Sequence, residues 1–167
     1  MIGSLLWSGG VCAATSTVAQ EATASASTVE EQTPPTGWIT KCDEREAGSV
    51  CTVEHTILVA KTRQRLVTVT FKIEPDAPRP ALMIQLPLGL FLPDGMEFQV
   101  DERNSQHLPI QTCNAKGCYA GSTVSQETLT SLMAGERLTV TFRNLAKKVM
   151  TVPVPLAGFG PAYQRVP

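Results

Sequence analysis

The sequence has few of the features that mark an enzyme or a nucleic-acid-binding protein. It contains two histidines and lacks the H-E-x-x-H, G-x-S-x-G and phosphate-cradling glycine motifs of common catalytic sites. Its 14 basic and 15 acidic residues nearly balance, so no strong net field steers nucleic acid or an anionic membrane to it. These absences predict a protein without catalytic residues, metal ligands or a cofactor.

The few candidate chemical groups have simpler structural interpretations. His55 falls in an expected strand on the same face as Val53 and Ile57, and His107 begins a strand beside a loop. Acidic side chains close in sequence, such as Glu97 and Asp101, are typical of a solvated edge. We therefore expect a protein that is not an enzyme, while a hydrolase with an unrecognised site stays an alternative.

No apolar run after residue 14 approaches the roughly 20 residues of a membrane-spanning helix. Residues 1–14 are apolar and rich in small residues, but they contain no Lys or Arg. They resemble the apolar part of a secretory signal that lacks its basic start, with possible cleavage after Ala14 or Ala19. A low-complexity N-terminus is the alternative interpretation.

The composition predicts three segments. Residues 1–19 form the incomplete signal-like segment, and residues 20–36 form a disordered tether that is rich in Ala, Ser, Thr and Glu and ends near Pro34-Pro35. Residues 37–167 form a single β domain. The signal-like segment predicts export, to the periplasm or to the cell surface and beyond.

Four cysteines remain once Cys12 leaves with the signal, and an even number in an exported chain indicates disulfides. Of three possible pairings we favour the local one, Cys42–Cys51 and Cys113–Cys118, because each pair brackets turn-forming residues. A zinc site of all four cysteines is the alternative, but the C-x8-C and C-x4-C spacings depart from the usual C-x2–4-C pairs.

Period-two alternation of apolar and polar residues predicts an all-β fold, an antiparallel β-sandwich of about seven to nine strands with one short helix. The clearest strand is Leu66–Ile73, whose Val and Phe side chains share one face and whose Thr side chains share the other. A helix is expected at Val124–Met133, capped by Thr123 with Gln126. The remaining expected strands are Trp38–Cys42, Cys51–Val59, Ala81–Leu86, Leu88–Leu92, Met96–Val100, His107–Cys113, Arg137–Arg143 and Val149–Val154.

Four sequence pieces resemble the invasion-associated locus B family, small exported proteins of alphaproteobacteria. They are Leu86-Pro87-Leu88-Gly89, Gly95-x-x-x-x-Val100-Asp101, Thr112-Cys113-x-x-x-Gly117-Cys118-x-Ala120 and Leu156-x-Gly158-Phe159. The resemblance covers about Trp38 to Tyr163 and supports a β-rich domain. By its name the family implies a part in host-cell association or invasion, and it implies no established chemistry.

Together these observations predict an exported, non-enzymatic binding or envelope protein. The expected partner is a protein or carbohydrate of the envelope or of a host cell, and a periplasmic chaperone or envelope assembly factor is the alternative function. Loops at the ends of a sandwich are held by a rigid scaffold and suit binding. The candidate binding residues are Asp43, Arg45, Lys61, Arg63, Asp101, Arg103, Asn114 and Lys116.

Overall fold

The computed structural model describes residues 37–46 and 48–167. The chain divides into two compact units, and the described residues all belong to the second, Pro34–Pro167. The expected signal-like segment and tether, with Cys12, lie outside the described residues. None of the described helices is long and apolar enough to cross a membrane.

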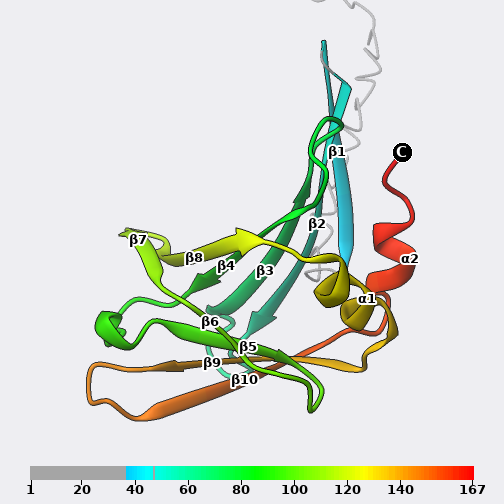
Figure 1. The fold of residues 1–167 in the computed structure, drawn as a ribbon. Helices are drawn as coiled ribbons and strands as arrows, with labels where there is room; N and C mark the ends of the chain where they lie inside the picture. Colours follow the sequence, from blue (N-terminus) through cyan, green and yellow to red (C-terminus); the bar gives the residue numbers. More distant parts are fainter. Residues whose placement is uncertain (1–36, 47) are drawn as a thin grey trace, which may run out of the picture. The chain divides into compact units, whose positions relative to one another are not determined.

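The described residues form ten strands in two antiparallel sheets, which confirms the predicted sandwich and adds one strand to the expected range (Figure 1). The larger sheet has the order β1-β2-β3-β4-β8-β7. Its strands are β1 (Ile39–Arg45), β2 (Gly48–Leu58), β3 (Arg65–Ile73), β4 (Ala81–Leu86), β8 (Gly117–Thr123) and β7 (Ile110–Asn114).

The smaller sheet lies across the larger one, and its strands run in a clearly different direction (Figure 1). Its order is β10-β9-β5-β6. The strands are β10 (Val149–Pro155), β9 (Arg137–Arg143), β5 (Met96–Val100) and β6 (Gln106–Leu108). Three helical segments complete the domain, namely η1 (Leu92–Asp94), α1 (Gln126–Ala134) and α2 (Phe159–Tyr163).

The core is built on the inward face of β3. Val67, Val69 and Phe71 are completely buried, as strict period two predicts for the side that faces another sheet. The outward residues Thr68 and Thr70 are buried as well, which differs from the expected solvated face. The reason is that β2 and β4 flank β3, so side chains of both neighbours cover the small threonines.

An aromatic cluster joins the start of the domain to its end. Trp38 packs against Phe159 with ring centroids 4.9 Å apart, and Phe71 lies at the same distance from Phe159. The Trp38 indole N–H donates to the carbonyl of Pro155 at 2.9 Å, so its polar edge is satisfied. Phe159 is therefore part of the core, and α2 is a second short helix that the sequence pattern did not predict.

Several expected boundaries were wrong for identifiable reasons. The helix is capped by Ser125, whose hydroxyl accepts the Thr128 N–H at 3.0 Å, and not by Thr123. The expected strand His107–Cys113 is split into β6 and β7, with Pro109 between them. The expected strand Leu88–Leu92 makes one isolated bridge, Leu90 to Asn144. The first strand was expected to end at Cys42, but β1 runs to Arg45.

Candidate functional site

Both disulfides sit at the outer edges of the six-stranded sheet. Cys42 on β1 lies directly opposite Cys51 on β2, and Cys113 on β7 lies directly opposite Cys118 on β8. The sulfur atoms are 2.08 and 2.10 Å apart, and the Cα atoms are 4.0 Å apart in both pairs. The local pairing is the one the sequence predicts. Because β1 and β7 are the two edge strands, each edge is tied covalently to its inner neighbour.

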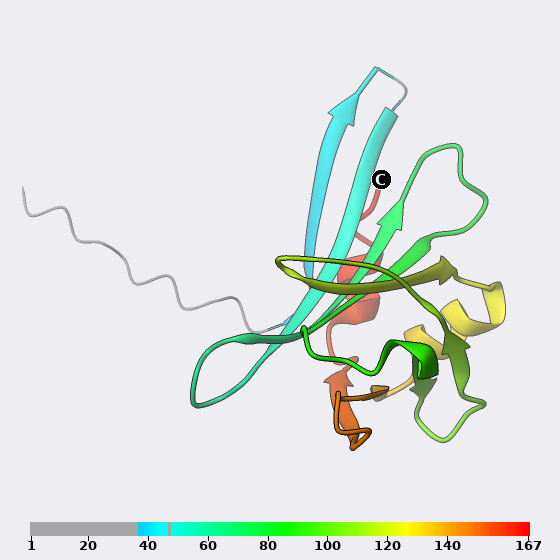
Figure 2. The ribbon, with the colours of Figure 1, turned by 90° about the vertical axis from the view of Figure 1, so that its left-hand side faces the viewer.

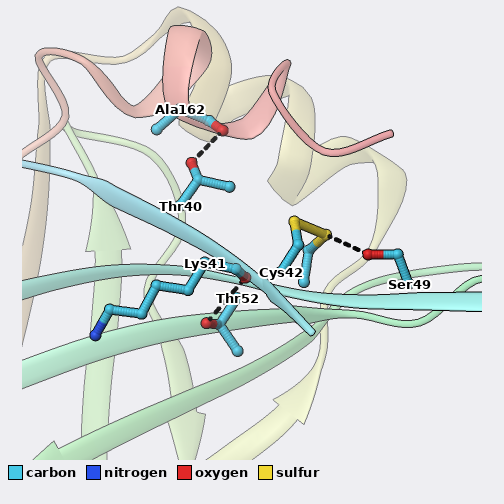
Figure 3. The surroundings of a disulfide bond; sticks show 7 residues. Thr40, Lys41, Cys42, Ser49, Thr52 and Ala162 are labelled. Atoms are coloured by element: carbon cyan, nitrogen blue, oxygen red, sulfur yellow. Dashed lines mark hydrogen bonds between the residues drawn. A yellow bond between two sulfur atoms is a disulfide. The ribbon is translucent and has the colours of Figure 1, made fainter. Parts of the chain in front are cut away.

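The β1 edge is also held by α2 (Figure 3). The Thr40 hydroxyl donates to the Ala162 carbonyl at 2.6 Å, and the Ser49 hydroxyl lies 3.6 Å from the Cys51 sulfur. Cys51 is completely buried, whereas Cys42 is exposed. The first disulfide therefore anchors an exposed edge strand to a core residue.

The β7–β8 turn is ordered by its own side chains. The side-chain amide oxygen of Asn114 accepts the Lys116 N–H at 2.8 Å and the Tyr119 hydroxyl at 3.4 Å. Gly117 has φ +144°, and a Cβ there would lie 2.3 Å from the Leu86 carbonyl oxygen, so only glycine fits. The turn thus packs closely against the end of β4.

The eight predicted binding residues fall into two groups of four. Lys61 and Arg63 lie in the β2–β3 turn, Asn114 ends β7, and Lys116 lies in the β7–β8 turn. The second group lies at the opposite ends of the strands. Asp43 and Arg45 are at the end of β1, and Asp101 and Arg103 are in the β5–β6 turn. All eight are exposed, but the structure does not bring them into one site.

Asp101 has a structural use. Its carboxylate accepts the backbone N–H of Arg137 at 2.9 Å and that of Glu136 at 3.2 Å. The residue has a positive φ of 49°, a conformation that Asp tolerates better than most residues. The Asp101 carboxylate therefore holds the connection between α1 and β9 in place. Part of its hydrogen-bonding capacity is used within the fold.

The β2–β3, β7–β8 and β9–β10 turns and the linker between β4 and β5 lie at the same strand ends, and we call them together the basic end (Figure 2). Arg65 donates to the Gln85 amide oxygen at 3.1 Å, and the Gln85 amide donates to the Lys116 carbonyl at 2.7 Å. The Leu145 N–H donates to the Gly89 carbonyl at 2.9 Å, which adds the β9–β10 turn. The basic side chains of these loops are Lys61, Arg63, Arg65, Lys116, Arg143, Lys147 and Lys148.

Basic and acidic side chains are therefore concentrated at opposite ends of the strands. The basic end carries these seven basic residues and one carboxylate, Asp94, which pairs with Arg143 at 3.0 Å. The loops at the opposite strand ends carry nine acidic and four basic residues. These are Asp43, Glu44, Glu46, Glu74, Asp76, Asp101, Glu102, Glu127 and Glu136, with Arg45, Arg79, Arg103 and Arg137. A net charge of −1 conceals this separation.

Sequence reasoning missed one part of the basic end, the β9–β10 turn with Arg143, Lys147 and Lys148. The cluster is visible in the sequence as Arg-Asn-Leu-Ala-Lys-Lys at 143–148. What the sequence does not show is that the topology places this turn beside the linker that follows β4.

A cleft of about 460 Å³ lies between the β5–β6 turn and α1. Its lining is mostly polar and consists of Val100, Arg103, Asn104, Gln106, Ser125, Glu127, Thr128 and Ser131. The Gln106 amide donates to the Thr128 hydroxyl at 2.8 Å, so two of the lining groups are already paired. Nothing in this lining has the nucleophile–base geometry of a catalytic site.

Two displaced pKa values have structural causes away from this cleft. A hydrogen bond from Lys72, whose Nζ lies 2.5 Å from the carboxylate, lowers the pKa of Glu74. Burial raises the pKa of Tyr163, which packs on Phe159. Neither residue lines the cleft, so neither shift marks a reactive group there.

The histidines have the predicted positions. His55 is buried on the inner face of β2 beside Trp38, with ring centroids 5.2 Å apart, and none of the described residues hydrogen-bonds to its Nδ1. The His107 ring lies 3.0 Å from the Asp94 carbonyl oxygen. Across residues 37–46 and 48–167, no three His, Cys, Asp or Glu side chains are placed to hold a metal ion.

Comparison with known proteins identifies the family. Residues 38–167 match the model of the invasion associated locus B (IalB) protein family. The chain belongs to this family. None of the curated proteins compared with the sequence matches it.

The fold of this family is also found in a solved structure, described as the crystal structure of invasion associated protein b from Bartonella henselae. The two chains share 21% identity with a TM-score of 0.68, over 77% of this chain and 88% of the other. At this identity the likeness supports the shared fold alone.

The disulfides give a direct chemical prediction. Peptide mapping without reduction should recover Cys42 joined to Cys51 and Cys113 joined to Cys118. By the chain-entropy model, loops this short should each stabilise the fold by about 2–3 kcal/mol, measured by urea unfolding of the matching double Cys→Ala variants. A peptide that joins Cys42 to Cys113 or Cys118, or stoichiometric zinc, would refute this pairing.

The β7–β8 turn gives a second prediction that separates its two polar residues. Asn114→Ala removes an acceptor of two hydrogen bonds and should lower the free energy of unfolding by about 1 kcal/mol. Lys116→Ala, the matched control, removes only an exposed side chain and should change it by no more than about 0.5 kcal/mol. Equal effects in urea unfolding would mean that Asn114 does not order the turn.

Proposed function

We propose that this chain is an exported, non-enzymatic binding protein, which holds a partner of the cell envelope or of a host cell on loops at one end of its sandwich. The observation that carries the proposal is the basic end. Four loops, distant in sequence but connected by hydrogen bonds, present seven basic side chains against one carboxylate. Such a concentration of one charge steers a partner of the opposite charge.

Export is supported by the two disulfides. Disulfides persist in oxidising compartments such as the periplasm and the extracellular space, and are rare in the cytosol. The family's description as invasion associated fits a protein that acts outside the cytoplasm, at the envelope or against a host cell.

Binding through preformed loops is supported by the way the loops are held. The β7–β8 turn is closed by a disulfide, and the β9–β10 turn is closed by hydrogen bonds of Asn144 with Lys147 and Lys148. A loop that is ordered before binding loses less conformational entropy when it binds. The arrangement therefore favours a surface that recognises a partner without rearrangement.

The alternative of a chaperone or assembly factor is less well supported. Such a protein needs a long apolar groove or an open sheet edge. The β10 edge of the smaller sheet carries Pro153 and Pro155, which cannot donate to an added strand. A hydrolase is less well supported still, since the polar cleft lacks a nucleophile–base pair.

Two measurements test this proposal. A full-length fusion to a reporter that is active only outside the cytoplasm should be active.

The mature domain should capture a partner from envelope extract or host-cell membranes. A variant with Lys61, Arg63 and Lys116 changed to Gln should lose capture, whereas an Asp43→Asn and Glu44→Gln control should keep it. An inactive fusion, or capture that depends on the control residues instead, would contradict the proposal.

A further inference from the structure

The tip of the β9–β10 turn carries a leucine that the fold does not need there. The Leu145 side chain is 72% exposed. The turn beneath it is closed by the hydrogen bond from the Lys147 N–H to the Asn144 carbonyl at 2.8 Å and by that from the Lys148 N–H to the Asn144 side chain at 3.0 Å. These bonds use the backbone and Asn144, so a polar residue at position 145 would form the same turn.

Further exposed apolar side chains lie on the neighbouring linker between β4 and β5. Leu88 is 57% exposed and Leu92 is 46% exposed. The linker touches the turn through the hydrogen bond between Leu145 and Gly89, and through Lys147, whose Nζ lies 4.8 Å from the centroid of the Phe91 ring. The three leucines stand on two neighbouring loops and are all substantially exposed. A soft apolar medium accommodates such protrusions more easily than a protein surface, which would need a separate pocket for each.

The charges around these leucines are almost all positive. Lys147 and Lys148 follow Leu145 directly, and Arg143 precedes it by two residues, with Asp94 as its only carboxylate partner. Lys116 and the three basic residues of the β2–β3 hairpin complete the basic end. Lysine side chains can keep their ammonium groups at headgroup level while their stems and neighbouring leucines enter the apolar region. A nucleic acid would complement the positive charge of the basic end, but it would offer no apolar contact to the exposed leucines.

We propose that the basic end is a membrane-docking surface, which binds an anionic phospholipid bilayer by inserting Leu145, Leu88 and Leu92 between headgroups that the surrounding lysines and arginines contact. This inference deepens the proposed function and rests on it, because it names the envelope or host-cell partner as a lipid surface. Combined apolar insertion and attraction of basic residues to anionic lipid is the usual basis of peripheral membrane binding.

The test is co-sedimentation of the mature, oxidised domain with lipid vesicles. The domain should bind vesicles of phosphatidylcholine containing phosphatidylglycerol, should not bind vesicles of phosphatidylcholine alone, and should dissociate as salt is raised. Each basic residue near an anionic surface contributes roughly fivefold in affinity. The double variant Lys147→Gln with Lys148→Gln should therefore bind more than about tenfold more weakly, and Leu145→Ser should bind about tenfold more weakly.

Matched controls lie on other parts of the domain. Lys41→Gln with Arg165→Gln removes two exposed basic residues away from the basic end, and Met133→Ser removes an exposed apolar side chain from α1. Both control variants should bind vesicles like the wild type. Urea unfolding of every variant confirms that lost binding does not reflect lost folding.

The outcomes separate this inference from the proposed function. If the folded wild type binds neither vesicle type but captures a protein or carbohydrate through the basic end, the membrane inference is wrong and the proposed function stands. Equal binding to both vesicle types, or equal losses in the control variants, would also overturn the inference. If the reporter fusion shows no export, the proposed function fails whatever the vesicles show.

Discussion

The domain depends on burying the inward face of β3. Val67, Val69 and Phe71 are fully enclosed because β3 lies in the middle of the larger sheet and faces the smaller one. Phe71 then packs on Phe159, which brings the C-terminal α2 against β1 and β2. Removal of a buried Phe from such a position typically costs 3–5 kcal/mol, roughly a third or more of the stability of a domain. The loops at both strand ends have fixed positions because this central packing fixes the strands.

The two disulfides complete that scaffold at the two edges of the larger sheet. Edge strands have a neighbour on one side only and are the parts of a sheet that most readily open or pair with another chain. Here each edge of the larger sheet is tied to its neighbour, and the β7–β8 disulfide also fixes Lys116 within the basic end. The same bonds that support export in the proposed function therefore support the geometry of the proposed binding surface.

Local features of the sequence predicted local features of the structure. Period two located β3, β5, β9 and β10, and the turn residues between the cysteines predicted both cross-strand pairs. The predictions that were wrong concern features that depend on contacts between segments distant in sequence. The burial of Thr68 and Thr70 requires strands on both sides of β3, and the packing of α2 requires Trp38. The charge balance was the most misleading feature, because only the strand order shows that the 61–65, 116 and 143–148 segments meet at one end.

We propose that the basic end of this rigid sandwich meets an anionic bilayer. Hydrogen–deuterium exchange of the mature domain, with and without phosphatidylglycerol vesicles, tests it segment by segment. We predict slower exchange in residues 59–65, 86–92, 114–117 and 143–149, with the β1–β2 hairpin and the β5–β6 turn unchanged. Slower exchange at those two acidic loops instead, or no change in the four basic segments when vesicles are added, would contradict it.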